Sequence, residues 1–440
     1  MGTGTREEPS FYFISDSLQY TIRGEVVLEE PVDGALLQEA VDIAFQRFPY
    51  FSVQMVLQNG RYVLIPNHRP HNVLHSDETL TLGSEAVNDH LVVVSWFENK
   101  IFFHVLHSLT DGAGRAPLTK AVLYYYLTRK YGIELDPEGI YLADSEMFGD
   151  EDQDDVPVSL ERMERAGDQC FRRSEHAGNL LERGIVADGP RTEWRFSTDE
   201  ASFIAACKSL GATPNSLASV LLAQSVWELD PDFAENVVVN LCVNLRKALQ
   251  CPHNHRLLLA CVPVSFGPES KEASAEELCK RARGSISSQS CEGNLFYLYR
   301  KNRLQADKLR KIRKLELKQK IMQSCIYGEE GFLGATFLVS YVGRGSLGSL
   351  APYVKAMYTT VDSIPRGGAM LEMTTASGRF FFSCIQDFQD DRLVRTLIRR
   401  LEALGLSIEV QGSGPVRAPH MQLPGTSLRL VRGTTSRIRS

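Results

Sequence analysis

The sequence contains no uninterrupted apolar run that approaches the ~18 residues of a membrane-spanning helix. It has nine cysteines, an odd number, and no Cys-x-x-Cys pair among them. Scattered single cysteines are typical of reduced thiols in a reducing compartment, whereas disulfide frameworks and zinc sites use regular spacings. No charged-then-apolar signal segment opens the chain. These absences lead us to expect a cytoplasmic protein with no membrane span.

The sequence also lacks an excess of positive charge. It holds 54 acidic and 48 basic residues, for a formal net charge of -6, so we expect no nucleic-acid partner. A length of 440 residues is too great for one ordinary hydrophobic core and favours two domains. A hydrophobic fraction of 43% and a charged fraction of 23% are ordinary for a globular protein.

The most informative stretch begins with the apolar run Ile101–Leu106, which predicts a buried strand. Turn and helix-start residues follow, and then a helical pattern over 116–131. His107 therefore lies where a buried strand ends, and an imidazole that titrates near neutral pH can act as a general base. Asp111 is available to fix the surrounding loop. The alternative is that His104 and His107 are hydrogen-bonded core residues and Asp111 caps a helix.

The segment His107-Ser-Leu-Thr-Asp111-Gly112 resembles the His-x-x-x-Asp-Gly signature of the chloramphenicol-acetyltransferase-like acyltransferases. That superfamily includes alcohol acetyltransferases, polyketide-associated acyltransferases and the condensation domains of nonribosomal peptide synthetases. The resemblance implies that His107 ends a strand of an N-terminal lobe and faces a tunnel between two lobes. Gly112 would allow a turn that a side chain could forbid.

A second stretch supports this resemblance. The β-branched run from Val237 ends in Asn244-Leu245-Arg246, which resembles the strand of the C-terminal lobe that terminates in an arginine. The resemblance implies that Arg246 reaches Asp111 across the lobes as a bidentate ion pair, a geometry that suits a guanidinium better than an ammonium. Asp111 would then have a structural role. The alternative is a strand with an exposed arginine at its end.

A third segment, Ser340-Tyr341-Val-Gly, resembles the segment that follows a C-lobe strand in alcohol acetyltransferases. A hydroxyl group of Ser340 or Tyr341 could hydrogen-bond the developing oxyanion or the acceptor. The alternative is that either hydroxyl pairs with the backbone.

The expected fold is α/β, with two similar lobes, each a mixed β-sheet flanked by helices, and the active-site tunnel between them. We place the N-terminal lobe at 1–189 and the C-terminal lobe at 190–410. Residues 144–168 are rich in Asp and Glu without an apolar period, which predicts a flexible, solvated connection. Residues 411–440 are rich in Gly, Pro, Ser, Thr and Arg, which predicts a disordered tail.

Several local elements follow from short-range signals. Phe11–Ile14 and Tyr20–Leu28 are predicted to be strands. A helix is predicted over Gly34–Phe48, with Asp33 as its N-cap. Asn59-Gly60 is a strong turn pair and predicts a β-hairpin.

His68, His71 and His75 occur close together, a spacing that could suit a metal ion. No cysteine or carboxylate cluster supports them, and two neighbouring prolines indicate a surface loop. We therefore expect a solvated loop and no metal site.

Residues 273–326 are predicted to be helical and become basic towards their end. Such a segment could form an electropositive patch for the phosphates of coenzyme A or for an acidic carrier protein. The alternative is an ordinary solvated helix face.

The resemblance implies an acyltransferase, expected to be monomeric, that needs no bound cofactor. An acyl-CoA or acyl-carrier thioester would be the co-substrate and donor, and a small-molecule alcohol or amine the acceptor. His107 would deprotonate the acceptor, which attacks the thioester directly. Condensation domains carry two adjacent histidines, but Leu106 occupies the first position here, which favours a free-standing enzyme. The alternatives are a non-catalytic condensation-domain-like binding module and a thioester hydrolase on the same fold.

Overall fold

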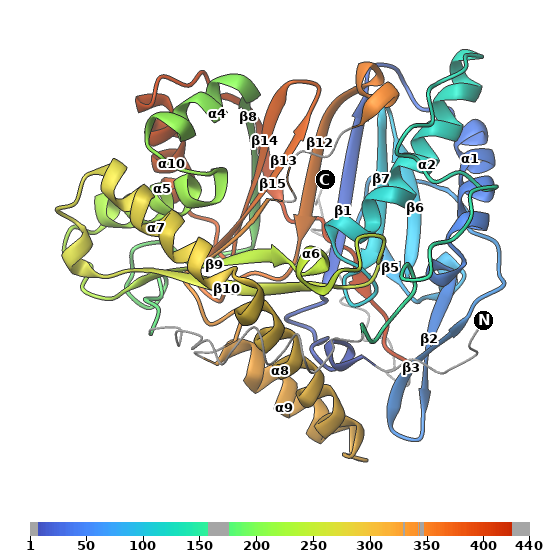
Figure 1. Cartoon of the computed structure of the whole chain (residues 1–440), viewed down its shortest axis with the longest axis horizontal. Coiled ribbons are helices and arrows are strands. Elements are labelled where there is room, and N and C mark those ends of the chain that lie inside the picture. Colours follow the sequence, from blue (N-terminus) through green and yellow to red (C-terminus); the bar gives the residue numbers. More distant parts are fainter. Residues whose placement is uncertain (1–7, 157–175, 329–330, 342, 344–346, 425–440) are drawn as a thin grey trace, which may run out of the picture.

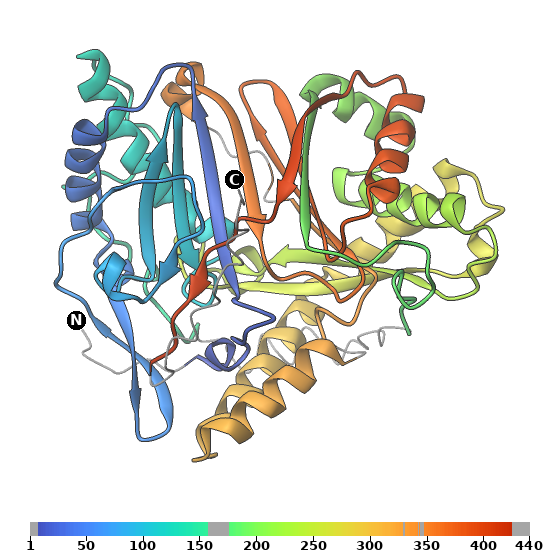
Figure 2. The same ribbon diagram turned by 180° about the vertical axis from the view of Figure 1, so that it is seen from behind.

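Two β-sheets lie side by side with helices on their outer sides, so the molecule has two lobes (Figures 1 and 2). The computed structural model describes residues 8–156, 176–328, 331–341, 343 and 347–424. This arrangement confirms the α/β, two-lobed fold that the sequence predicts.

The first sheet has the strand order β12-β1-β7-β6-β4. Its strands are β1 Thr21–Leu28, β4 Leu74–His75, β6 Val92–Phe97, β7 Lys100–Leu106 and β12 Val354–Val361. Two helices pack against each other on its outer side, α1 Gly34–Arg47 and α2 Gly112–Tyr131 (Figure 1). Strand β7 runs antiparallel to both of its neighbours, β1 and β6, so it lies in the middle of the sheet, where its apolar residues are buried.

The second sheet has the order β10-β9-β11-β13-β14-β8-β15. Its strands are β8 Thr192–Asp199, β9 Val237–Asn244, β10 Leu259–Phe266, β11 Phe337–Tyr341, β13 Ala369–Ala376, β14 Arg379–Gln386 and β15 Glu409–Pro415. The helices on its outer side are α4 Glu200–Ser209, α5 Pro214–Leu229, α7 Ala275–Gln289 and α10 Arg392–Ala403 (Figure 1). Strands β9 and β10 extend towards the first lobe and end beside the short helix α6, Arg246–Leu249.

Smaller elements complete the chain. Helices α8 and α9 project together from the lower side of the molecule in Figure 1, next to the hairpin of β2 and β3. Their bounds are α8 Glu292–Arg310, α9 Leu315–Tyr327, β2 Val53–Gln58, β3 Arg61–Pro66, β5 Thr81–Leu82 and β16 His420–Met421. The 3-10 helices are Pro9–Tyr12, Pro49–Phe51, Glu85–Val87, Pro268–Ser270 and Gly348–Tyr353.

The lobes do not divide at residues 189 and 190 as we expected. Strand β12 comes from the second half of the chain but pairs with β1 in the first sheet, from Ile22 opposite Val361 onwards. In the other direction, Leu180 and Val186 lie before the expected boundary yet belong to the core of the second lobe. Pairing with β12 gives the edge of β1 hydrogen-bond partners that it would otherwise lack, and the exchange ties the lobes together.

We predicted a disordered tail from residue 411, but the chain remains ordered beyond this residue. Strand β15 pairs with β8 and adds a strand to the second sheet, while β16 pairs with β5 of the first lobe. The backbone nitrogen of Met421 donates to Gln19 Oε1 at 2.7 Å. The small residues here make backbone hydrogen bonds at a sheet edge, which do not depend on a side-chain pattern. Residues 425–440 lie outside the described residues.

The described part of the acidic stretch, residues 144–156, is not the solvated connection that we predicted. Glu151 is buried and forms two hydrogen bonds with the buried Arg47, Nη1 to Oε2 at 2.7 Å and Nη2 to Oε1 at 2.6 Å. Asp150 accepts a hydrogen bond from the backbone of His253 at 3.0 Å. The acidic residues up to 156 therefore bind basic and backbone groups of both lobes, which a composition rule cannot show, and residues 157–168 lie outside the described residues.

The local predictions mostly hold. Asp33 caps α1 by accepting hydrogen bonds from two backbone nitrogens, and Asn59 and Gly60 form the hairpin turn with φ of 52° and 71°. The strand predicted over Phe11–Ile14 is wrong, because the chain forms a 3-10 helix there. Phe11 and Tyr12 are both fully buried, whereas a strand would direct successive side chains to opposite faces.

The group His68, His71 and His75 contains one histidine that is largely shielded from solvent. The ring of His71 stacks between those of Phe45 and His90, with centroid distances of 3.7 Å to each. Within the described ranges, no set of three His, Cys, Asp or Glu side chains is close enough to hold a metal ion. His71 therefore contributes to packing, which the loop interpretation did not anticipate.

Burial of neutral histidines predicts a loss of stability at acid pH. Burial lowers the pKa of His71 to about 3 and that of His255 to about 4, and it lowers the pKa of His104 well below 6.5. The unfolded chain binds protons on these groups below about pH 6.5 while the native state does not, so the free energy of unfolding falls as the pH falls from 6.5 towards 4. Glu372, whose pKa burial raises to about 7, acts in the opposite direction.

Urea unfolding between about pH 5 and 7 measures this slope. His71→Gln can keep the hydrogen bond to Ser52 and does not titrate, so it should flatten the slope by up to about 1.4 kcal/mol per pH unit. The matched control is His68→Gln at an exposed position, which should leave the slope unchanged. Equal slopes in wild type and His71→Gln would contradict the assignment.

Candidate active site

His107 follows the last residue of β7 and is fixed by two hydrogen bonds. Its backbone nitrogen donates to the carbonyl of Tyr20 at 2.9 Å, and its ring Nδ1 lies 3.0 Å from the carbonyl oxygen of Thr110. Because a carbonyl oxygen only accepts, Nδ1 carries the hydrogen in the neutral ring. The other nitrogen, Nε2, is then the atom that can take a proton from a substrate.

Tyr20 holds the other side of the imidazole. Its ring stacks on that of His107 with a centroid distance of 4.9 Å and an angle of 14° between the planes. The Tyr20 backbone has a φ of 53°, which is strained for a bulky residue. The carboxylate of Asp362, which directly follows β12, stabilises this conformation by accepting hydrogen bonds from the backbone nitrogens of Gln19, Tyr20 and Thr21. Sequence reasoning missed Asp362, because its partners are more than 340 positions away.

Asp111 and Arg246 form the buried bidentate ion pair that the resemblance implied. Both oxygen–nitrogen contacts are 2.9 Å, Oδ2 to Nη1 and Oδ1 to Nη2. Asp111 also accepts hydrogen bonds from the backbone nitrogens of Gly114 and Leu258, each at 2.9 Å. The carboxylate makes no hydrogen bond to His107 among these contacts, so its geometry fits a structural role.

Arg246 is held as firmly as its partner. Its Nε and Nη2 atoms donate to the carbonyl oxygens of Asn254 and Arg256, both at 2.6 Å. Nη1 also lies 3.3 Å from Oδ1 of Asn244, the last residue of β9. The predicted alternative, an exposed arginine at a strand end, is therefore wrong.

The glycine on which the packing of this loop depends is Gly114 rather than Gly112. Gly112 is simply the first residue of α2. A Cβ atom at Gly114 would clash with the carbonyl oxygen of His255 and with Thr110 Oγ1. Thr110 Oγ1 itself donates to that His255 oxygen at 2.6 Å, so the motif loop lies directly against the second lobe.

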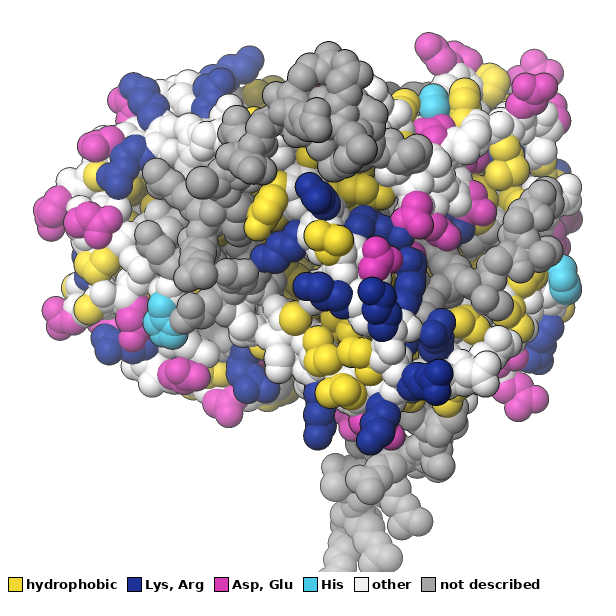
Figure 3. Space-filling view, turned by 60° about the horizontal axis from the view of Figure 1, so that its bottom comes forward, with side chains coloured by type: hydrophobic (Ala, Val, Ile, Leu, Met, Phe, Trp, Pro, Cys, Tyr) yellow, Lys and Arg dark blue, Asp and Glu magenta, His cyan; other side chains and the backbone are white. Residues whose placement is uncertain are grey.

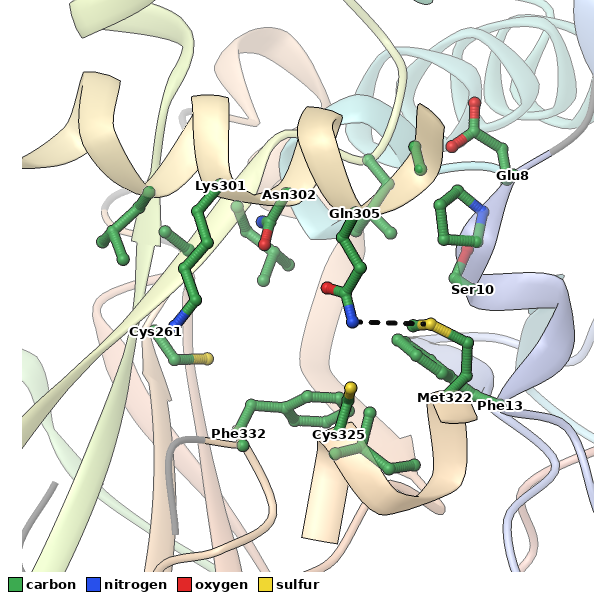
Figure 4. Close-up of a pocket in the computed structure, with 18 of the residues that line it drawn as sticks. Glu8, Ser10, Phe13, Cys261, Lys301, Asn302, Gln305, Met322, Cys325 and Phe332 are labelled. Atoms are coloured by element: carbon green, nitrogen blue, oxygen red, sulfur yellow. Dashed lines mark hydrogen bonds between the residues drawn. The ribbon is translucent and has the colours of Figure 1, made fainter. Parts of the chain in front are cut away.

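A cavity of about 1200 Å³ extends from His107 to α8 and α9. Near the imidazole its wall includes Tyr20 and the side chains Cys242 and Cys261, which face each other across β9 and β10. Figure 4 shows the part next to the two helices, where Gln305 of α8 points towards Met322 of α9 and Lys301 of α8 extends towards Cys261. The rings of Phe13 and Phe332 lie near Met322 and Cys325 on the opposite side. The cavity wall is thus mainly apolar, and its polar groups come from α8 and from other segments, including Glu8, Asp154 and Arg256.

Ser340 and Tyr341 do not line this cavity. Ser340 hydrogen-bonds the buried carboxyl group of Glu372 on the adjacent strand β13, and the Tyr341 ring packs against Phe380 at a centroid distance of 5.2 Å. Both side chains therefore have contacts within the second lobe, and the structure does not bring them to His107.

The surroundings of His107 favour the neutral imidazole. Burial lowers its pKa below 6.5, while the carbonyl of Thr110 and the charge of Asp111 act in the opposite direction, and Arg115 lowers the pKa further. A ring that is neutral at physiological pH can accept a proton, as a general base must.

Comparison with known proteins gives matches at the level of structure alone. No protein-family model and no curated protein matches the sequence. The first condensation domain of the CDA synthetase is 12% identical, with a TM-score of 0.58, over 92% of this chain and 96% of that one. Polyketide synthase associated protein 5 from Mycobacterium tuberculosis is 13% identical, with a TM-score of 0.54, over 88% and 96%. The F. graminearum TRI101 protein, solved with coenzyme A and deoxynivalenol, is 10% identical, with a TM-score of 0.54, over 91% and 97%.

These matches cover nearly the whole of each chain, so the protein shares its two-lobed fold with this condensation domain, polyketide synthase associated protein 5 and the TRI101 protein. At 10–13% identity these matches establish the fold alone. The reaction must be inferred from the residues of the site.

The ion pair predicts a stability defect. Asp111→Ala leaves the buried guanidinium of Arg246 without its anion and should lower the free energy of unfolding by about 3–5 kcal/mol. Urea unfolding measures the change. The exposed pair Asp391–Arg395 is the matched control, since Asp391→Ala should cost at most about 1 kcal/mol. Equal losses in the two variants would refute a special role for Asp111.

Proposed function

We propose that the protein transfers an acyl group from a thioester to a small alcohol or amine, with His107 as the general base. The observation that carries this proposal is the hydrogen bond from Nδ1 of His107 to Thr110, because it leaves Nε2 of a cavity-lining ring able to accept a proton. The fold is shared with the TRI101 protein, which was solved with coenzyme A.

The reaction proceeds in two proton transfers. Nε2 of His107 takes the proton from the acceptor hydroxyl or amine while its oxygen or nitrogen attacks the thioester carbonyl. When the carbon–sulfur bond breaks, the imidazolium returns that proton to the leaving thiolate. Asp111 takes no part in proton transfer, because Arg246 and two backbone nitrogens occupy its oxygens. General-base assistance contributes ~10²–10⁴ in rate, and holding both substrates in line contributes more.

The donor is an acyl-CoA or an acyl-carrier thioester, and no resident cofactor takes part in the proposed steps. Arg300, Lys301 and Lys308 of α8 line the outer cavity, where cationic side chains suit the phosphates that both donor types carry. The apolar wall nearer His107 suits an acyl chain or an apolar acceptor.

The direct test uses a mixture of acyl-CoAs with a panel of alcohols and amines. Thiol release that depends on the acceptor, together with an ester or amide product identified by mass spectrometry, is the expected result. Acceptor-independent thiol release would identify a hydrolase instead. Intact-protein mass spectrometry with donor alone should show no acyl adduct on Cys242 or Cys261, the thiols of the cavity wall, because the attack is direct.

His107→Ala should lower kcat by ~10²–10⁴ in a protein that still folds, because the side chain supplies the base. The matched control is His68→Ala at an exposed position of the first lobe, which should keep wild-type turnover. Wild-type rates in His107→Ala would refute the assignment.

The pH dependence of kcat/KM provides a separate check. Because burial lowers the pKa of His107, the imidazolium forms only below pH 6.5, and the rate should fall as the pH decreases through that lowered pKa. The residual activity of His107→Ala should lack this acidic limb. An acidic midpoint above about 7 would contradict the proposed base.

A further inference from the structure

One segment of the described chain carries a large excess of positive charge. Residues 292–327, which form α8, α9 and their connection, contain ten Lys or Arg and three Asp or Glu. Their net charge is +7, whereas the rest of the chain carries -13. Five of the ten basic residues lie in the last turn of α8 and in the connection to α9, at Lys308, Arg310, Lys311, Arg313 and Lys314.

The same surface exposes large apolar side chains. Tyr297 and Leu304 on α8, Leu317 on α9 and Leu57 on the neighbouring hairpin are each 39–50% exposed. The hairpin belongs to this surface because Arg61 Nη2 donates to the carbonyl of Arg310 at 2.9 Å. Figure 3 shows Lys and Arg side chains gathered around hydrophobic ones on this face. We call the outward surface of α8, α9 and the hairpin tip the basic face.

The arrangement on α8 is regular. Tyr297, Lys301, Leu304 and Lys308 follow spacings of three and four residues, which place them along one side of a helix. The same four residues line the cavity that reaches His107. The basic face therefore borders the cavity along α8, where cationic and apolar groups alternate.

We propose that the basic face docks onto an anionic lipid bilayer, which places the cavity mouth at the membrane surface. Cationic side chains interspersed with exposed Leu and Tyr are the pattern by which a helix lies in the interface, where apolar groups enter the acyl boundary and cations bind headgroups. The bound phosphates of a soluble donor would neutralise the cations but leave the leucines in water. Within the described ranges, no helix has the length and apolarity needed to pass through a bilayer.

The geometry favours a bilayer over an acidic protein partner. The exposed apolar side chains lie on three elements at one side of the molecule, two helices and a hairpin, and a flat surface can contact all three together (Figures 1 and 3). If the proposed function holds, docking lets a lipophilic acceptor or acyl chain enter the mainly apolar cavity without crossing water.

Flotation of the full-length protein with vesicles tests the proposal. It should float with phosphatidylcholine vesicles that contain about 30% phosphatidylglycerol, not with pure phosphatidylcholine, and increasing salt should weaken the binding. Lys311→Glu with Lys314→Glu should weaken it at least about tenfold, and Leu317→Ser several-fold. These three side chains are exposed and do not line the cavity. The matched control is Lys208→Glu with Arg281→Glu, which reverses two exposed charges on the second lobe and should change binding less than twofold.

Failure to bind anionic vesicles would overturn the proposal, as would wild-type binding by Lys311→Glu with Lys314→Glu. Binding of an acidic acyl carrier protein to the basic face without vesicle binding would also overturn it. The membrane docking and the acyl transfer can be tested independently. The charge-reversed variant should keep wild-type turnover of water-soluble, short-chain substrates. A wild-type protein that binds vesicles but transfers no acyl group would leave the docking intact and refute the proposed function.

Discussion

The buried ion pair between Asp111 and Arg246 is the constraint on which the site depends. Moving two charges out of water is costly, and the cost is offset only when every hydrogen-bonding position is used. Here the carboxylate accepts four hydrogen bonds, and the guanidinium also binds two carbonyl oxygens of the second lobe. Any shift of the motif loop would break several of these bonds at once, so the loop that follows His107 has one position relative to the second lobe.

The exchange of strands between the lobes provides a second constraint. Strand β12 brings Asp362 to the first sheet, where it holds the strained backbone of Tyr20, and Tyr20 in turn supports the ring and backbone of His107. The imidazole is therefore fixed from both sides, by Thr110 in the motif loop and by Tyr20. Two lobes in contact only through side chains could shift relative to each other. Here such a shift would break backbone hydrogen bonds between them, which costs free energy.

The sequence predicted the parts of the site that are local or carried by a motif. His107, Asp111 and Arg246 belong to recognisable segments, and Asp33 and Asn59-Gly60 act through neighbours in the chain. Prediction from the sequence failed where contacts between distant segments determine the structure. Glu151 lies in a stretch whose composition is typical of a flexible connection, but it forms an ion pair with Arg47. The chain after residue 410 forms strands because it pairs with β8 and β5. Asp362 has no local signal, since its partners are its neighbours only in space.

Buried and exposed charged groups have different effects in this protein. Inside, burial favours the neutral form of His107, which the proposed general base requires, but every buried neutral histidine favours the unfolded state at acid pH. The protein can retain these rings only because packing elsewhere is extensive, and both lobes contain large apolar cores. Outside, exposed cations such as Lys311 and Lys314 remain hydrated and are accessible to partners. Because one cavity joins His107 to these helices, a change in surface charge can alter which molecules reach the cavity without altering the proton transfers that we propose at His107.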